Sequence, residues 1–154
     1  MRPSMGKIRE YIFNVLQPFE AERVNDLFAG TGALGIEALS RGAEYVHFVD
    51  NHSCSLRLIR ENLDRIGVPK DCRRCTKANA LHFLERTDET FDLLLADPPY
   101  GLDLPEAFFR SCREHLNPGG IFVLEYSARK IDSGDWESSR YKKSGSSAVW
   151  MFRR

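Results

Sequence analysis

The sequence predicts an α/β protein with a mostly parallel, seven-stranded sheet, helices on both faces of the sheet and an antiparallel hairpin at the C-terminus. Two observations predict this class. Apolar segments of strand length alternate with segments of helical periodicity, which is typical of parallel strands joined by right-handed helical crossovers. The last two apolar segments have no helix between them and meet at Ser144-Gly145-Ser146, as expected of a hairpin.

The first elements follow from periodicity and from the residues that end them. Residues 8–19 form an expected amphipathic helix because their apolar side chains recur on one face, and Pro18 ends it. Residues 23–28 form a short strand that runs into glycines. Residues 33–41 form the next helix, and Gly42 follows it as a C-terminal capping residue.

The later elements repeat this alternation. A strand is expected over 44–50 and a helix over 53–66, whose core-facing side chains are Leu56, Ile59, Leu63 and Ile66. The strand over 91–96 is nearly continuous in apolar residues, so both of its faces should be covered. The remaining elements are expected as a strand over 72–77, a helix over 79–86, a helix over about 104–116, a turn at 117–120, and strands over 120–126, 136–143 and 147–153.

Length and composition predict one domain over 1–154, with residues 1–19 as an N-terminal helix packed on the sheet. Because no apolar run is long enough to span a membrane and the first residues lack a secretory signal, we expect a cytoplasmic protein without membrane contact. We also expect a monomer. The 22 basic and 22 acidic residues cancel, which does not favour a nonspecific nucleic-acid binder, although basic residues gather at both ends of the chain.

Cys72 and Cys75 have the C-x-x-C spacing of redox and metal sites. Both fall in a predicted strand, where residues i and i+3 point to opposite faces, and no second pair of cysteines or histidines completes a ligand set. We therefore expect no metal site.

A glycine loop follows the first strand. Gly30, Gly32 and Gly35 match G-x-G-x-x-G between a strand and a helix, and Asp50 ends the next strand, which is the context of a nucleotide-binding loop. Asp26, just before the glycines, would repel the pyrophosphate of a dinucleotide, whereas it would attract the sulfonium and ammonium groups of S-adenosylmethionine (SAM). The sequence therefore predicts SAM as the cofactor, with Asp50 accepting hydrogen bonds from the ribose.

A second motif, Asp97-Pro98-Pro99-Tyr100, follows the buried strand over 91–96. A carboxylate there is costly unless it has partners, and the two prolines remove backbone donors while their carbonyls remain acceptors. One carboxylate and a nearby carbonyl suit an amino group with two hydrogens, and Tyr100 provides a surface on which an extruded base can stack. We expect these four residues to hold the amino group that receives the methyl.

These motifs resemble those of the amino-group methyltransferases of class I, Rossmann-like fold. Arg2-Pro3-Ser4, residues 7–10 (Lys-Ile-Arg-Glu) and Phe13-Asn14 are similar to the opening stretch of the RsmD family, and residues 28–43 follow that family's pattern. The resemblance covers essentially the whole chain. It implies an enzyme of rRNA processing that methylates the exocyclic amino group of a guanine in small-subunit (16S-type) rRNA, within the small ribosomal subunit.

The resemblance also implies roles for individual residues. The expected cofactor-binding residues are Asp26, Phe28, Ala29, Gly30, Gly32, Asp50, Asn51, Asn79, Ala80 and Asp97, with Asn79 and Ala80 flanking the adenine. The expected RNA-binding residues are the basic ones near both ends of the chain, namely Arg2, Lys7, Arg9, Lys142 and Lys143.

Two alternatives stay open. The same motifs serve SAM-dependent enzymes that methylate DNA adenine or a protein glutamine, and the opening helix favours rRNA over these by resemblance alone. The other alternative is a truncated, non-catalytic fold that binds SAM or RNA, because the basic, glycine-containing segment that family members carry before the opening stretch is missing here.

Overall fold

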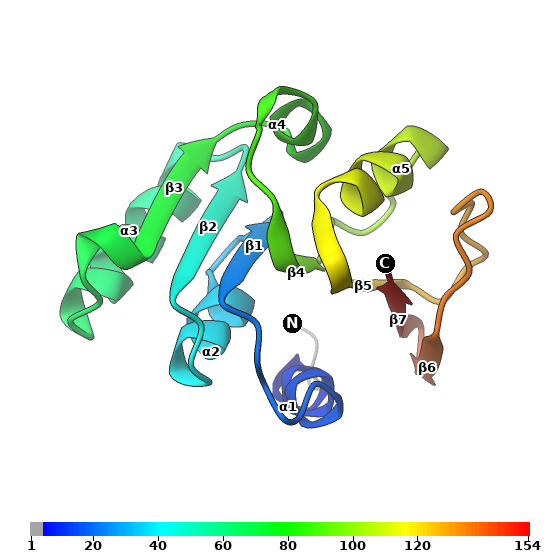
Figure 1. Ribbon diagram of the computed structural model, residues 1–154, viewed down its shortest axis with the longest axis horizontal. Helices are drawn as coiled ribbons and strands as arrows, with labels where there is room; N and C mark the ends of the chain where they lie inside the picture. The colour runs from blue at the N-terminus through cyan, green and yellow to red at the C-terminus, as the bar shows by residue number, and fades with distance from the viewer. Residues whose placement is uncertain (1–4) are drawn as a thin grey trace.

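Seven strands form one sheet in the order β3-β2-β1-β4-β5-β7-β6 (Figure 1). The computed structural model describes residues 5–154. Strands β1 to β5 run parallel, and β7 lies antiparallel between β5 and β6, which confirms the predicted fold class. The strands are β1 (Arg23–Leu27), β2 (Tyr45–Asp50), β3 (Arg73–Lys77), β4 (Phe91–Ala96), β5 (Leu116–Ser127), β6 (Arg140–Ser144) and β7 (Ser147–Arg153).

Helices cover both faces of the sheet. Figure 1 shows α1, α2 and α3 on one face and α4 and α5 on the other. Their bounds are α1 (Met5–Val15), α2 (Ala33–Ser40), α3 (Ser53–Arg65), α4 (Ala80–Arg86) and α5 (Glu106–Glu114), with a short 3₁₀ helix η1 (Lys70–Cys72) before β3. The central strands can be covered by helices on both faces because they carry buried apolar side chains toward both layers.

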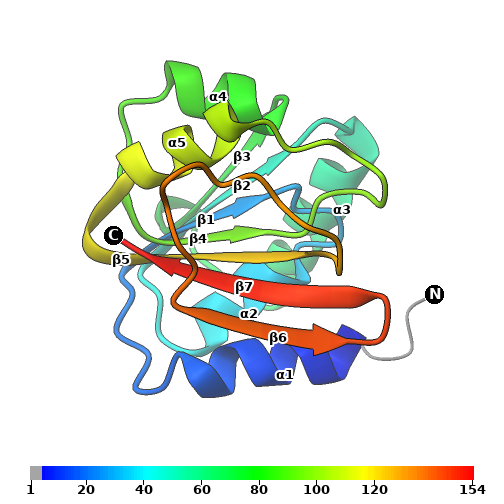
Figure 2. The same ribbon diagram turned by 90° about the vertical axis from the view of Figure 1, so that its right-hand side faces the viewer.

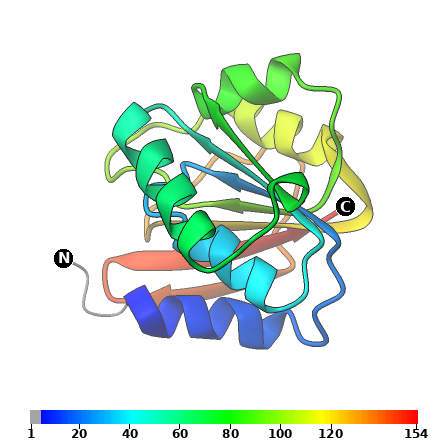
Figure 3. The same cartoon turned by 90° about the vertical axis from the view of Figure 1, so that its left-hand side faces the viewer.

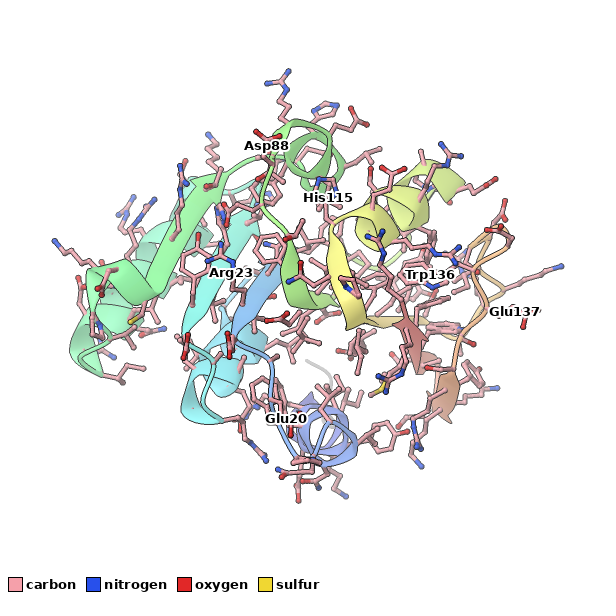
Figure 4. All side chains as sticks on the ribbon, in the orientation of Figure 1. Glu20, Arg23, Asp88, His115, Trp136 and Glu137 are labelled. Carbon is pink, nitrogen blue, oxygen red and sulfur yellow. The ribbon has the colours of Figure 1, made fainter. Side chains whose placement is uncertain are left out.

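The two layers have separate cores. On the side of α1, α2 and α3, the fully buried Ile12 and Phe13 pack with Phe48 and Ile59. On the side of α4 and α5, rings of Phe108, Phe109, Phe122 and Phe152 contact one another at centroid distances of 5.7–6.2 Å. Trp136, labelled in Figure 4, extends this cluster with its ring 4.8 Å from that of Phe152. Burial of this apolar surface is the main contribution to stability.

The predicted turn at 117–120 is wrong. These residues belong to β5, and the pairing with β4 shifts from Phe91↔Leu116 to Leu93↔Ile121, so that residues 117–120 bulge from a continuous strand. The bulge is stabilised by the chain end, because Gly119 N–H donates to the Arg154 carbonyl at 3.1 Å and Arg154 N–H donates to Gly120 at 2.9 Å. Turn residues therefore serve here as a bulge rather than as a connection.

Other element boundaries also differ from the expectation, and three of the differences have a clear physical reason. The first helix ends at Val15 rather than at residue 19, because the residue before Pro18 disfavours helical backbone. The strand expected from 136 begins at Arg140, because Trp136 turns into the core instead of continuing an edge strand. Cys72 lies in η1 rather than in a strand, and all four cysteines of the chain are free.

One core position was also predicted wrongly. Ile66 follows the last turn of α3 and is 59% exposed, whereas Leu56, Ile59 and Leu63 are buried as expected. The helix ends at Arg65, so Ile66 no longer follows the helical periodicity that placed it on the buried face.

A buried polar network joins β2 to its neighbours. His47 Nδ1 lies 2.8 Å from Glu89 Oε1, and His47 Nε2 lies 2.7 Å from Thr76 Oγ1. Arg23, labelled in Figure 4, reaches Glu89 at 2.9 Å and lies over the Tyr45 ring at 4.3 Å. Burial lowers the pKa of His47 and raises the pKa of Tyr45 to about 12. His47 is therefore a buried residue whose two ring nitrogens both have partners.

The carboxyl ends of the parallel strands meet at one edge of the molecule. Figures 2 and 3 show the loops after β1, β2 and β4 at this edge, together with the turn between β6 and β7 and the start of α1. Ligands of open α/β sheets bind at such an edge, near the point where the strand order changes direction between β1 and β4.

Candidate functional site

The glycine loop after β1 has a backbone that few residues can adopt. Gly30 has φ +56° and Gly32 has φ +78°, and Phe28 adopts φ +55° although it is not a glycine. The loop is closed by hydrogen bonds from Ala29 N–H to Val49 at 3.0 Å and from Gly32 N–H to Ala29 at 2.7 Å. Such a strained residue persists only where its surroundings hold it, and this is common at binding sites.

Gly35 has a steric role in the same motif. A Cβ at Gly35 would lie 2.4 Å from the Phe48 ring and 3.0 Å from Asp26 Oδ2. Its N–H donates to Asp26 Oδ2 at 2.9 Å. Close packing of α2 on the sheet therefore requires glycine here, and the same contact orients the Asp26 carboxyl.

Asp50 supports the loop from the next strand. Its Oδ2 accepts a hydrogen bond from Gly30 N–H at 2.8 Å, and its Oδ1 accepts one from His52 N–H at 2.8 Å. The residue is 8% exposed. Because a carboxylate oxygen has two lone pairs, Oδ2 retains capacity for a further donor.

A cavity of about 230 Å³ lies between the glycine loop and the end of β4. It joins residues of α1, β1, the glycine loop, the loop after β4 and β5. Its lining residues are Arg9, Asp26, Phe28, Ala29, Gly30, Thr31, Ala33, Leu34, Asp97 and Glu125. The structure thus brings the two predicted acids, Asp26 and Asp97, into one cavity with the glycine loop.

A larger cavity, of about 360 Å³, lies at the opposite edge of the sheet and is lined by residues such as Pro18, Phe19, Asp92 and Gly120. Asp92 holds that edge together, since its Oδ2 accepts from Glu22 N–H at 3.1 Å and Arg23 N–H at 3.0 Å. Cavity size alone does not identify the site, because only the smaller cavity contains the glycine loop and its acids.

The smaller cavity has three carboxyl groups in its lining, those of Asp26, Asp97 and Glu125. Burial raises the pKa of Asp26 well above its usual value, the Gly35 N–H lowers it, and the nearby Asp97 and Asp50 carboxyl groups raise it again. Asp26 is 1% exposed and Glu125 is 5% exposed. Acidic side chains in this arrangement can bind positively charged groups of a ligand.

The loop after β4 projects from the cavity toward solvent. Asp97 is half-buried, Pro98 is buried and Tyr100 is 83% exposed. The Pro99 carbonyl accepts the N–H of Leu102 at 3.2 Å, so this carbonyl already has one donor. The Tyr126 hydroxyl donates to the Leu102 carbonyl and ties the loop to β5. The Tyr100 side chain is exposed to solvent, and its stacking on a base stays a prediction.

The other predicted cofactor residues lie along the same edge. Asn79 precedes α4, and its Oδ1 accepts hydrogen bonds from the N–H groups of Leu81 at 3.0 Å and His82 at 3.3 Å. This side chain therefore caps the helix. Ala80 is 3% exposed and packs in the core, whereas Asn51 is exposed. Contact of Asn79 and Ala80 with an adenine stays a prediction.

The predicted RNA-binding residues divide into two groups. Lys7 on α1 and Lys142 and Lys143 on β6 are exposed, and Lys142 Nζ lies 5.2 Å from the centre of the Tyr11 ring, which places β6 beside α1 (Figure 2). Arg9 instead lines the cavity of the glycine loop. Arg2 lies outside the described residues.

Sequence reasoning missed Glu125. This residue lies in β5 directly after the apolar run from Ile121 to Leu124. A single acid near the carboxyl end of such an apolar strand is the signal that could have identified it. The strained conformation of Phe28 had no local signal, because a φ above zero is normally associated with glycine or asparagine.

Two further properties concern the described part of the chain. Among residues 5–154, no three His, Cys, Asp or Glu side chains are grouped so that they could hold a metal ion. Within the same residues, no helix has both the length and the apolar character needed to cross a membrane.

Comparison with known proteins gives consistent results. Residues 1–153 match the family model described as "Conserved hypothetical protein 95". The protein "Putative rRNA methyltransferase YlbH" of Bacillus subtilis is 33% identical over 99% of this chain and 88% of its own length. "Ribosomal RNA small subunit methyltransferase D" of Haemophilus influenzae is 29% identical over 94% of this chain and 79% of its own length. The solved structure "Putative methyltransferase yhhF from Escherichia coli" is 26% identical to this chain. It superposes with a TM-score of 0.87 over 100% of this chain and 87% of its own.

Proposed function

The chain belongs to the family described as conserved hypothetical protein 95, the RsmD family, and from this membership we propose that it transfers a methyl group from SAM to the exocyclic amino group of a guanine in small-subunit rRNA. One observation carries the proposal. Asp26 in β1 and Asp97 directly after β4 line one cavity with the glycine loop, so the acid proposed to bind the cationic part of SAM and the acid proposed to accept the amino group border the same space.

The residues present fit SAM. When bound, this cofactor supplies a methyl group on a positively charged sulfur. The carboxyl groups of Asp26, Asp97 and Glu125 line the cavity, where they can bind the sulfonium and ammonium groups. Gly30 lacks a side chain beside the cavity and Asp50 Oδ2 has a free lone pair, so the loop can accept a nucleoside with its ribose against the backbone.

Asp97 would act on the target nitrogen. A guanine amino group is a weak nucleophile because its lone pair is delocalised into the ring. The Asp97 carboxylate would accept a hydrogen bond from this group, which orients the lone pair toward the cavity. It would also offset the positive charge that develops on nitrogen as the N–C bond forms and the S–C bond of the sulfonium breaks, and it can accept the proton that the nitrogen then loses. Tyr100, exposed beside it, would stack on the base after the base leaves its helix.

The proposed partner is rRNA within the small ribosomal subunit. Lys7, Lys142 and Lys143 lie exposed on adjacent elements, where phosphate groups can reach them. We propose further that the protein acts as a single-domain monomer in the cytoplasm, where its substrate is assembled.

The test is methyl transfer from labelled SAM to unmethylated small ribosomal subunits, naked rRNA and DNA. We expect label in the RNA and its recovery as N2-methylguanosine after digestion. The Asp97→Ala variant should lose transfer by about 100-fold or more, because it removes a group that stabilises charge in the transition state, while SAM binding persists. The Asp50→Ala variant should fold normally and bind SAM more weakly.

Other outcomes would contradict parts of this proposal. Label on DNA adenine or on a protein would overturn the rRNA substrate. SAM binding without transfer to any substrate would favour a non-catalytic fold. Full transfer by Asp97→Ala would remove this residue from the reaction.

A further inference from the structure

We propose that Arg9 binds the α-carboxylate of the methionyl part of SAM, so that a helix outside the sheet completes the cofactor site. The inference rests on the function proposed above, because it concerns the same cofactor. It changes the role of Arg9 from RNA contact to cofactor recognition.

The position of Arg9 is the first argument. Arg9 lies on α1, which begins at the carboxyl edge of the sheet (Figure 2), and its side chain lines the cavity together with Asp26, Asp97 and Glu125. Among the described residues that line this cavity, Arg9 is the one lysine or arginine. The glycine loop residue Thr31 borders the same end of the cavity.

Charge complementarity is the second argument. The amino-acid end of SAM carries a carboxylate as well as an ammonium group. The acids at the base of the cavity attract the ammonium and the sulfonium but repel the carboxylate. A buried or half-buried carboxylate therefore needs a cation of its own, and a guanidinium can bind it through two parallel hydrogen bonds.

The availability of Arg9 is the third argument. Its Nε lies 3.9 Å from Glu37 Oε1, which is beyond hydrogen-bonding distance. Glu37 is bound more closely by Arg41, whose Nε lies 2.7 Å from Glu37 Oε2. The Arg9 side chain is 39% exposed, so within residues 5–154 its guanidinium can turn toward a ligand without breaking a close ion pair.

The packing of α1 sets the direction of Arg9. Its neighbour Ile8 is buried, and the next turn buries Ile12 and Phe13 in the core that α1 shares with α2, α3 and one face of the sheet. This packing fixes the rotation of the helix and leaves Arg9 on the side that borders the glycine loop. The helix therefore contributes a ligand group as well as core surface.

Calorimetric titration with SAM and with decarboxylated SAM tests the proposal, because the two molecules differ only in the carboxylate. For Arg9→Gln, we expect SAM affinity to fall by about tenfold or more, the size of one charge-assisted pair. Affinity for decarboxylated SAM should stay within about twofold. The matched control is Arg110→Gln, which removes an exposed arginine from α5 on the other face of the sheet and should change neither affinity.

The outcomes separate the two proposals. If the wild-type protein binds SAM and Arg9→Gln binds it equally well, or loses both ligands equally, the role of Arg9 is wrong and the proposed function stands. If the wild-type protein does not bind SAM, both fall. Circular dichroism checks folding, and if Arg9→Gln does not fold, Arg9→Lys takes its place, with a smaller loss that is again confined to SAM.

Discussion

The Asp26 carboxyl group lowers the stability of the fold when it is ionised, although its proposed role is to bind the cofactor. Its carboxyl group is almost fully buried, and Asp97 and Asp50 lie close enough to raise its pKa further. An ionised carboxylate in such surroundings costs stability unless a cation is present. The Gly35 N–H offsets part of this cost and fixes the orientation of the group.

The Asp26→Asn variant tests this balance. Because the raised pKa makes ionisation unfavourable in the folded state, the stability associated with the neutral acid is present at low pH and lost as pH rises through that raised pKa. Asparagine stays neutral and keeps an acceptor for Gly35. We expect a gain of about 1 kcal/mol in the free energy of unfolding at pH 8, a smaller gain at pH 5, and weaker SAM binding at pH 8.

Urea unfolding at both pH values and calorimetric titration provide the measurements. Asp26→Ala is the control, because it removes the acceptor as well as the charge and should gain less stability. Reduced stability of Asp26→Asn at pH 8 would contradict this account of the buried acid.

At the scale of elements, the glycine loop and α2 form one unit. The positive φ angles of Gly30 and Gly32 let the chain turn sharply after β1, and Gly35 lets α2 lie directly against Phe48 of β2. Asp50 then holds the Gly30 N–H from the neighbouring strand. The shape of the cavity therefore depends on the distance between helix and sheet as well as on loop sequence.

Gly35→Ala tests this dependence. Its methyl group would meet the Phe48 ring at 2.4 Å, so α2 must move. We expect a loss of about 1–3 kcal/mol in the free energy of unfolding, as for other overpacked cores, together with weaker SAM binding through displacement of Asp26.

Gly6→Ala is the matched control for this substitution. A Cβ at Gly6 meets nothing within 4 Å, and alanine favours the helix, so stability should stay equal or rise by up to about 1 kcal/mol. Equal effects of the two substitutions would contradict a specific steric role for Gly35.

At the scale of the whole molecule, buried polar groups join strands that lie far apart in sequence. His47 on β2 contacts Thr76 on β3 and Glu89 before β4, and Arg23 on β1 reaches the same glutamate. Burial lowers the pKa of His47, so the folded protein favours its neutral form. This network therefore stabilises the sheet most at pH values at which His47 is uncharged.

This network predicts acid sensitivity. Because the pKa of His47 is lower in the folded state than the usual 6.5, its contribution to stability is complete above about pH 6.5 and is lost as pH falls through the folded value. His47→Gln should cost about 1–3 kcal/mol at pH 7.5 through lost buried hydrogen bonds. The variant should also lose less stability than wild type between pH 7.5 and pH 5.

Thermal and urea unfolding of wild type and His47→Gln between pH 5 and pH 7.5 give the difference in their free energies of unfolding at each pH. Asp26 has the opposite pH dependence, but it is present in both proteins, so its effect cancels in this difference. Identical pH dependence in wild type and His47→Gln would contradict the assignment.

Local patterns in the sequence determined the order and type of nearly all elements, together with the glycine loop and the Asp97 motif. Such features depend on side chains close in the chain: strand β4 was predicted with its observed bounds because its six residues are almost all apolar. The bulge at 117–120 was missed because the partner that stabilises it is the chain end at Arg154.

Only the tertiary structure decided which charged groups converge. Glu125 reaches the cavity because β5 pairs with β4, and Arg9 reaches it because α1 packs into the core on one face of the sheet. It also decided the place of β7 between β5 and β6. These are long-range contacts, set by the joint packing of helices and sheet, and neither periodicity nor the spacing of motifs carries that information. The sequence by itself therefore determined the fold class and the position of the two motifs at strand ends, and the structure determined which charged side chains share a cavity with them.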